Sequence, residues 1–166
     1  MWWWAFVLVL WSVLHGDLLA DSLLKCVMQT AAEKPFLDIS LSLDGSTAFA
    51  ASTDRTVMIY DAKNLADVSR TITAPAIGQF LHPSMPSCVA PSQVNAYHIV
   101  SGAYDGIVRL WDLRSTKVPI ASMHVSDKAG NVDKGGKVLS VDWARGLIGI
   151  GGESGLEIWR VAEQNA

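Results

Sequence analysis

The chain has 166 residues, of which 50% are hydrophobic and 17% are charged. This balance is typical of a folded domain and excludes an intrinsically disordered chain. The net charge of −3 and the scattered basic residues exclude binding driven by nucleic-acid phosphates, which needs clustered lysine and arginine. The two cysteines, Cys26 and Cys88, lack neighbours at metal-ligand spacing, and we expect buried or half-buried thiols in a reducing compartment.

The N-terminal run Met1–Leu14 is almost wholly apolar and holds four of the seven tryptophans. It is shorter than the ~18 residues that cross a bilayer as a helix. Three interpretations stay open: a secretory signal without the usual basic residues, a membrane-surface anchor without a basic face, and an atypical leader with no role in folding. We therefore divide the chain into an apolar leader over residues 1–25 and a folded domain over 26–166.

Three segments superimpose without gaps and define an internal repeat: DRTVMIYD (54–61), DGIVRLWD (105–112) and ESGLEIWR (153–160). They begin about 50 residues apart, within the range of repeat architectures. In each, an acidic residue lies six positions before an aromatic residue, which is Tyr60, Trp111 or Trp159 in turn. Internal repetition of this kind predicts a fold built from copies of one unit.

Each repeat segment has the pattern of a β-hairpin. Apolar residues such as Val57 and Ile59 alternate with more polar ones, as in a half-buried strand. The acidic residue belongs to a turn-forming sequence, in which its side chain accepts hydrogen bonds from nearby backbone N–H groups. Small residues before the turn let a neighbouring sheet pack closely, and we expect the aromatic residue to fill the gap between adjacent sheets.

Further strand-like runs complete each unit. The expected inner strands, upstream of the hairpins, are Phe36–Leu41, Ala76–Leu81 and Val138–Trp143. The expected outer strands, downstream of the first two hairpins, are Val68–Thr73 and Val118–Met123. Turn signals separate inner strands from hairpins at Asp44–Gly45, His82–Pro83 and Arg145–Gly146. The Pro- and Ser-containing insert Pro83–Asn95 is expected to be a mobile loop.

Over residues 26 to 161 the chain resembles the WD-repeat β-propeller. The resemblance lies in the four strands per unit, the repeat period and the Trp111–Asp112 pair. The resemblance implies an all-β fold, a partial propeller of about three four-stranded blades whose final blade lacks its outer strand. The Gly-His dipeptide of the family is absent, and Thr73–Ala76 and Asp133–Gly136 stand in its place. We therefore expect the family's Asp–His–Ser–Trp hydrogen-bond network to be incomplete.

The extent of the repeats predicts a truncated form of a longer protein or a gene fragment. A closed propeller needs at least four blades, so three leave sheet edges and apolar faces exposed. The final unit stops after its third strand, as when a strand from the start of the propeller completes the last blade. Leu23–Thr30 is expected to be the outer strand of a blade whose other strands are missing.

Three stretches are similar to the end of a narrower family, the ribosome-assembly WD-repeat proteins that work with pescadillo and the block-of-proliferation protein: Ser101–Ser115, Lys137–Trp143 and Gly146–Glu153. The resemblance implies a protein-binding scaffold for large-subunit (pre-60S) assembly and rRNA processing in the nucleus (nucleolus and nucleoplasm). Its partners would be those two proteins and, indirectly, the pre-ribosomal particle, with neither nucleic acid nor membrane bound directly. Nothing matches the family's N-terminal ubiquitin-like domain. The alternatives are a generic WD-repeat adaptor and a secreted or membrane-tethered propeller fragment.

In a propeller, the hairpin turns and the loops entering the inner strands share one face. This placement makes Thr53, Arg55, Tyr104 and Lys137 candidate partner-binding residues, together with the insert 126–136. Tyr104 is the candidate anchor, since an exposed aromatic side chain suits an interface hot spot. Packing of Tyr104 against the next blade, and solvated charges at Arg55 and Lys137, are the competing interpretations. The residues expected to be structural are Asp54, Tyr60, Asp105, Trp111, Asp112 and Trp159.

The sequence offers no support for an enzyme. It lacks a Gly-x-Ser-x-Gly elbow and a phosphate loop ending in Gly-Lys-Ser/Thr. The glycine-rich stretch Gly149–Gly155 precedes an expected strand, so it lacks the helix N-terminus that binds phosphate. The four histidines do not pair at metal-ligand spacing. We expect no catalytic residue, no cofactor and no metal.

Overall fold

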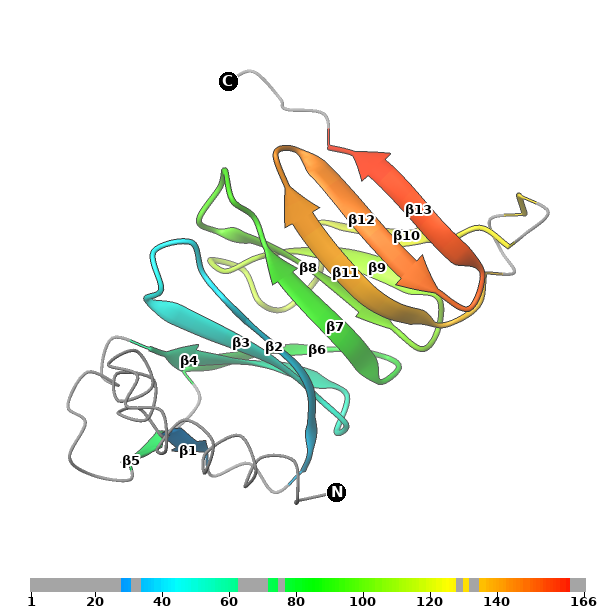
Figure 1. Cartoon of the computed structure of the whole chain (residues 1–166). Helices are drawn as coiled ribbons and strands as arrows, with labels where there is room; N and C mark the ends of the chain where they lie inside the picture. The colour runs from blue at the N-terminus through cyan, green and yellow to red at the C-terminus, as the bar shows by residue number, and fades with distance from the viewer. Residues whose placement is uncertain are drawn as a thin grey trace, which may run out of the picture.

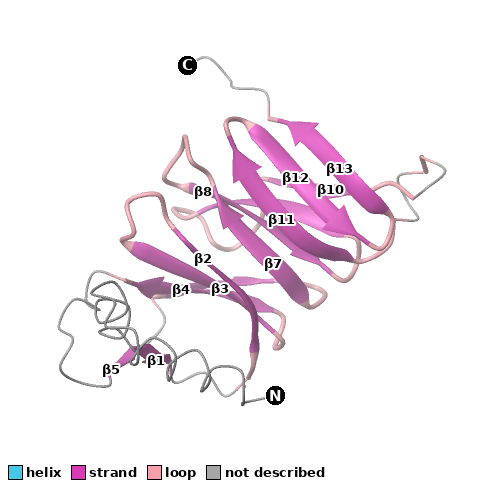
Figure 2. Cartoon of the chain, in the orientation of Figure 1, coloured by secondary structure: helices cyan, strands magenta, loops and turns pink. Residues whose placement is uncertain are grey.

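The computed structural model describes residues 28–30, 34–62, 72–74, 77–127, 130–131 and 135–161, and every regular element in these ranges is a β-strand. The strands form three successive antiparallel sheets, which we call blades 1 to 3, and a small two-stranded parallel sheet (Figure 1). Figure 2 shows the three blades as separate layers of strands joined by loops. The all-β partial propeller is therefore confirmed, whereas the leader expected over residues 1–25 lies outside the described residues.

Blade 1 has four strands in the order β2 (Phe36–Leu41), β3 (Thr47–Ser52), β4 (Thr56–Asp61) and β6 (Gly78–Leu81). The hairpin β3–β4 pairs Ala51 with Val57. The predicted Asp44–Gly45 turn joins β2 to β3 and is confirmed. Gly45 has a φ of 67°, a left-handed conformation that glycine adopts without a steric cost.

Blade 2 has the same order of strands: β7 (Pro86–Pro91), β8 (His98–Ala103), β9 (Ile107–Asp112) and β10 (Ala121–His124). Its hairpin β8–β9 pairs Gly102 with Val108, the register of the first hairpin. The outer strand β10 ends one residue after the end of the predicted run Val118–Met123.

Blade 3 has three strands, β11 (Val138–Ala144), β12 (Leu147–Gly152) and β13 (Gly155–Arg160), with β13 at its edge. Gly151 pairs with Leu156 in its hairpin, so all three predicted hairpins are confirmed. The remaining strands, β1 (Met28–Thr30) and β5 (Ile72–Ala74), pair in parallel. Met28–Thr30 thus lies outside any antiparallel blade, unlike the outer strand expected over Leu23–Thr30.

Three assignments between the first and second hairpins were wrong. Gly78–Leu81 pairs with β4 as the outer strand of blade 1, and is not the inner strand of blade 2. That inner strand is β7, a buried strand within Pro83–Asn95, where a mobile loop was expected. Prolines at both ends of β7 weaken its strand pattern in the sequence. Proline is nevertheless tolerated at the edge of a sheet and at a bulge, and β7 is an edge strand with a bulge. A third assignment, the outer strand expected over Val68–Thr73, was wrong in its described part: Ile72 and Thr73 belong to β5, which pairs in parallel with β1, and residues 68–71 lie outside the described residues.

Side chains buried between blades 1 and 2 form the first interblade core. Phe80 from the outer strand of blade 1 contacts Trp111 from blade 2, with ring centroids 4.8 Å apart. Val57 and Ile59 of β4 face the same core as Val89 of β7. The inner strands are also joined across the blades, because the Val89 N–H donates to Asp38 Oδ2 at 2.9 Å.

A second core lies between blades 2 and 3, where Val108 and Cys88 meet Val138, Trp143 and Ile150. The inner strands β2, β7 and β11 contact one another in succession along these two interfaces (Figure 1). Cys88 is buried, as predicted, and this burial raises the pKa of its thiol to about 11. Cys26 lies outside the described residues.

A buried polar chain ties blade 2 to the loop that enters it. Trp111 Nε1–H donates to Ser101 Oγ at 2.9 Å, and Ser101 Oγ lies 2.7 Å from His82 Nε2. His82 Nδ1 lies 3.3 Å from the Phe80 carbonyl and donates to it, which leaves Nε2 to accept from Ser101. Three members of the family's network are therefore assembled here, although the Gly-His signal is missing. The acidic member, Asp105, instead pairs with Arg109, whose Nη2 lies 2.6 Å from Asp105 Oδ2.

We predict that Gly102→Ala destabilises the fold by about 1–3 kcal/mol, because overpacking a close-packed core forces neighbours to move. A Cβ at Gly102 would lie 2.3 Å from Val138 Cγ1 and 2.7 Å from Cys88 Sγ. Gly149→Ala is the matched control, since nothing lies within 4 Å of its added Cβ, and it should change the unfolding free energy by less than ~0.5 kcal/mol. Urea unfolding followed by circular dichroism measures both; equal effects would contradict the interblade contact.

A second prediction concerns pH. Burial, the largest cause, lowers the pKa of His82 from 6.5 to about 4, so the unfolded chain binds more protons between these values. The contribution of His82 to stability is complete above about pH 6.5 and is lost progressively as the pH falls to about 4, by roughly 2–4 kcal/mol. His82→Gln should lose this part of the dependence. Urea unfolding of both proteins at pH 7, 5.5 and 4 measures it, and parallel losses in both would rule out His82 as the cause.

Candidate functional site

The three hairpin turns and the loops that enter the inner strands lie at one end of the blades, which we call the turn face. Backbone bonds join each turn to the loop entering the inner strand of its own blade: Thr53 N–H to Pro35 O at 3.1 Å, Tyr104 N–H to Met85 O at 3.0 Å, and Glu153 N–H to Lys137 O at 3.1 Å. A further bond, from His82 N–H to Arg55 O at 2.9 Å, joins the turn of blade 1 to the loop entering blade 2. These bonds hold the candidate partner-binding residues on a backbone fixed by the blades.

Tyr104 and Lys137 are brought together on the turn face. The Lys137 ammonium lies 5.5 Å from the centroid of the half-buried Tyr104 ring, within the range of a cation–π contact. The same ammonium pairs with Glu153 Oε1 at 3.2 Å, and the Lys137 N–H donates to Glu153 Oε2 at 3.0 Å. The Lys137 backbone N–H and then its ammonium hold the pKa of Glu153 below its usual value. Blades 2 and 3 thus share a cluster of aromatic, cationic and anionic groups.

Thr53 and Arg55 occupy the turn of blade 1, and no contact among the described residues joins them to Tyr104 or Lys137. Arg55 is exposed and has a φ of 71°. The equivalent position in blade 2 is Gly106, with a φ of 73°. Blade 1 thus places an arginine in a conformation that costs an L-residue about 1 kcal/mol. Of the insert 126–136, only residues 126–127, 130–131 and 135–136 are described.

The three acidic residues expected to be structural are held by local partners. Asp54 Oδ1 accepts from the Thr56 N–H at 3.1 Å, which closes the first hairpin turn. Asp105 accepts from the Ile107 N–H at 3.2 Å and from Arg109. Asp112 pairs with Arg114 at 2.6 Å, and the hydrogen bonds from that side chain lower the pKa of Asp112 to about 2.

The three repeat aromatic residues share an orientation. Trp111 faces blade 1 and Trp159 faces blade 2, so each packs toward the preceding blade. Tyr60 of blade 1 has the same orientation, on the face directed away from blade 2, where it meets Phe36 edge-on at 6.2 Å. Trp111 and Trp159 therefore lie in or beside the interblade cores, whereas Tyr60 lies on the outer face of blade 1.

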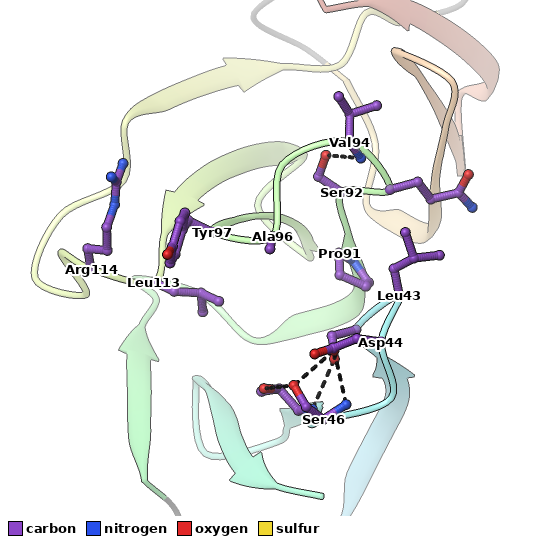
Figure 3. A pocket seen from close by; sticks show the side chains of 13 residues that line it. Leu43, Asp44, Ser46, Pro91, Ser92, Val94, Ala96, Tyr97, Leu113 and Arg114 are labelled. Atoms are coloured by element: carbon purple, nitrogen blue, oxygen red, sulfur yellow. Dashed lines mark hydrogen bonds between the residues drawn. The ribbon is translucent and has the colours of Figure 1, made fainter. Parts of the chain in front are cut away.

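The opposite end of blades 1 and 2 carries a groove of about 520 Å³ that the sequence did not indicate (Figure 3). Leu43 and Asp44 line it from the loop between β2 and β3. Val94 and Tyr97 come from the loop between β7 and β8, and Arg114 follows β9. Leu43, Val94 and Tyr97 are exposed, so the groove offers apolar surface at the junction of two blades.

Two local motifs shape the groove. Asp44 Oδ1 accepts from Ser42 Oγ at 2.7 Å and from the Ser46 N–H at 3.1 Å, which fixes one wall. On the other wall, the Arg114 guanidinium stacks over the Tyr97 ring at 4.7 Å while it pairs with Asp112. The sequence showed Leu43, Val94 and Tyr97 only as single apolar residues near turns, because no local signal states which loops from different blades converge.

The described residues contain no group of three or more histidine, cysteine, aspartate or glutamate side chains arranged to hold a metal ion. Within the same ranges, no helix is long and apolar enough to cross a membrane.

The WD domain, G-beta repeat family matches residues 24–61 and 78–112. A "Ribosome biogenesis protein YTM1" from Laccaria bicolor is 50% identical over 135 residues, which is 81% of this chain and 28% of the relative. A protein of the same name from Coprinopsis cinerea is 49% identical over 136 residues, or 82% and 28% of the two chains. A "Ribosome biogenesis protein WDR12 homolog" from Ixodes scapularis is 32% identical over 133 residues, or 79% and 28%.

A solved structure described as "Crystal structure of RRP9 WD40 repeats" superimposes with a TM-score of 0.62 at 14% identity, over 80% of this chain and 37% of that one. At this identity the similarity concerns the fold alone. The chain spans about 28% of the length of the ribosome biogenesis proteins that it matches.

Proposed function

This chain belongs to the WD-repeat β-propeller family, and we propose that it is a protein-binding scaffold in the assembly of the large ribosomal subunit and the processing of its RNA. The observation that carries the proposal is the 50% identity, over 81% of this chain, with a protein named for ribosome biogenesis. The match covers 28% of that relative, so the activity of the whole relative is a proposal for this chain.

The proposed role is that of a scaffold without catalytic activity. The buried titratable groups of the described residues serve the interior: His82 is bonded to Ser101 and Phe80, and the Cys88 thiol has a raised pKa. A nucleophilic cysteine needs the opposite shift, toward the thiolate. The described blades offer a ligand the loops and turns of the turn face and, at the opposite end, the groove between Leu43 and Tyr97.

By the family resemblance, the proposed partners are the block-of-proliferation protein and pescadillo, and the proposed location is the nucleus. The proposed contact residues are Thr53, Arg55, Tyr104 and Lys137 on the turn face. Tyr104 supports this choice because its half-buried ring and the cation above it form a preorganised anchor. The left-handed conformation of Arg55 supports it as well, since backbone strain is concentrated at functional positions.

Affinity purification of the tagged chain from nuclear extract tests this proposal. We expect the block-of-proliferation protein to co-purify with the wild-type chain. Tyr104→Ala should reduce its recovery by about tenfold or more, because removing a hot-spot aromatic residue costs at least ~2 kcal/mol of binding. Quantitative mass spectrometry of the eluates measures both proteins.

Tyr97→Ala is the matched control. Tyr97 and Tyr104 flank the six residues of β8, so they lie at opposite ends of blade 2, roughly 20 Å apart at the rise of an extended strand. Tyr97→Ala should leave recovery within about twofold of the wild type. Equal losses in the two variants would reject the turn face as the contact surface, and recovery free of ribosome-assembly factors would reject the proposed function.

A further inference from the structure

The groove between blades 1 and 2 has apolar side chains on both of its walls. Leu43 of blade 1 is 75% exposed, and Val94 and Tyr97 of blade 2 are 67% and 50% exposed. Figure 3 shows that these side chains come from loops of two different blades at the same end of the sheets. Apolar side chains that gather at one junction, rather than singly, mark an interaction surface.

The loop that carries Val94 and Tyr97 is held by bonds within the chain. The hydroxyl of the buried Ser92 accepts from the Val94 N–H at 3.2 Å and from the Asn95 N–H at 3.1 Å. Asn95 Oδ1 accepts from the Tyr97 N–H at 3.0 Å, and the Tyr97 carbonyl accepts from the Leu113 N–H at 2.8 Å. This wall is therefore preorganised, which lowers the conformational entropy lost when a ligand binds.

Arg114 adds a cation at the rim of the groove, beyond the Tyr97 ring (Figure 3). Its Nε donates to Asp112 Oδ1 at 3.0 Å, and its Nη2 donates to Asp112 Oδ2 at 2.6 Å. No hydrogen bond within the described part of the chain uses Nη1, and the side chain is 63% exposed. Because a guanidinium has five N–H donors in one plane, a second edge of the fork is left for another acceptor.

The acceptor that matches this edge is a carboxylate. Guanidinium and carboxylate groups pair through two parallel N–H···O bonds, so the planar fork selects this geometry. A phosphate has the same geometry but a larger negative charge. Asp112 is already paired with the guanidinium, and Asp44 lines the groove, so a doubly charged group would be repelled more strongly than a carboxylate.

The groove is elongated. It shares Leu43, Pro91, Ser92 and Gln93 with a second hollow, of about 140 Å³, that reaches Trp143 of blade 3. A surface that runs over three blades fits an extended chain better than a compact ligand. Alternate side chains of an extended chain point to the same side, so an apolar and an acidic side chain can face the groove together.

We infer that the groove is a second docking surface, which binds an extended segment of a partner protein: an apolar side chain packs against Leu43 and Val94, and an acidic side chain pairs with Arg114. The groove lies at the opposite end of the blades from Tyr104. Its ligand and the partner proposed for the turn face therefore bind independently of each other.

Binding to a set of synthetic peptides tests this site with the full-length chain. The fluorescein-labelled peptides have about eight residues, which span roughly 26 Å when extended, and blocked ends. Each carries one leucine and one glutamate, at varied spacing, among glycines and serines. We expect at least one spacing to bind with a dissociation constant below about 1 mM by fluorescence anisotropy. Replacing its glutamate by glutamine, or its leucine by serine, should weaken binding about tenfold or more.

Substitutions in the chain locate the bound peptide. Arg114→Gln should weaken binding of the glutamate peptide about tenfold or more and leave that of the glutamine peptide unchanged, as expected for two groups in contact. Val94→Ser should have the same relation to the leucine. Val118→Ser is the matched control, because Val118 is 66% exposed, as Val94 is 67%, and does not line the groove. It should leave the dissociation constant within about twofold of the wild type.

Circular dichroism confirms that each variant is folded. No saturable binding at any spacing, or binding that persists in both Arg114→Gln and Val94→Ser, would overturn the inference. Tighter binding of a phosphoserine peptide would overturn the assignment of a carboxylate. A dimer in light scattering that Val94→Ser dissociates would assign the groove to a second copy of the chain instead. Arg114→Gln should not change recovery of the block-of-proliferation protein, so failure of one proposal leaves the other intact.

Discussion

The burial of side chains between successive sheets is the interaction on which the rest of this structure depends. A four-stranded sheet has two faces and no interior, so a blade gains stability by packing those faces on its neighbours. Phe80 and Trp111 meet at the first interface, and Val108 and Trp143 face the second core. Polar groups join the same interfaces where backbone atoms approach, as Asp38 does at Val89.

The packing of the blades determines which surfaces remain open to a partner. Once the faces are buried against each other, only the strand ends are free to vary, and they carry the turn face at one end and the groove between Leu43 and Tyr97 at the other. The interblade cores fix the backbone beneath both surfaces, and on the turn face the Lys137 ammonium lies over the Tyr104 ring. A scaffold protein of this design binds through loops on a rigid support.

The repeat in the sequence was sufficient to locate the three hairpins, because each combines an acidic turn, period-two alternation and an aromatic residue. It failed at β7, where Pro86 and Pro91 weaken the strand pattern and only pairing with β8 reveals the strand. It also missed His82 as the partner of Ser101, since the histidine joins its network across 19 residues without the expected glycine. Cys88, Trp111 and the turn at Asp44 follow local rules and could be anticipated. The groove could not, because it arises from loops of two blades whose approach is set by tertiary packing.

A double-mutant cycle between Phe80 and Trp111 tests the interblade contact most directly, because the two residues belong to different blades and their rings are 4.8 Å apart. Phe80→Leu, Trp111→Phe and the double variant are compared with the wild type by urea unfolding at one protein concentration. Packing of the blades predicts a coupling energy of about 0.5–1.5 kcal/mol, the range for aromatic pairs in contact. Additive effects, with a coupling below ~0.3 kcal/mol, would show that the two sheets do not pack on each other in solution.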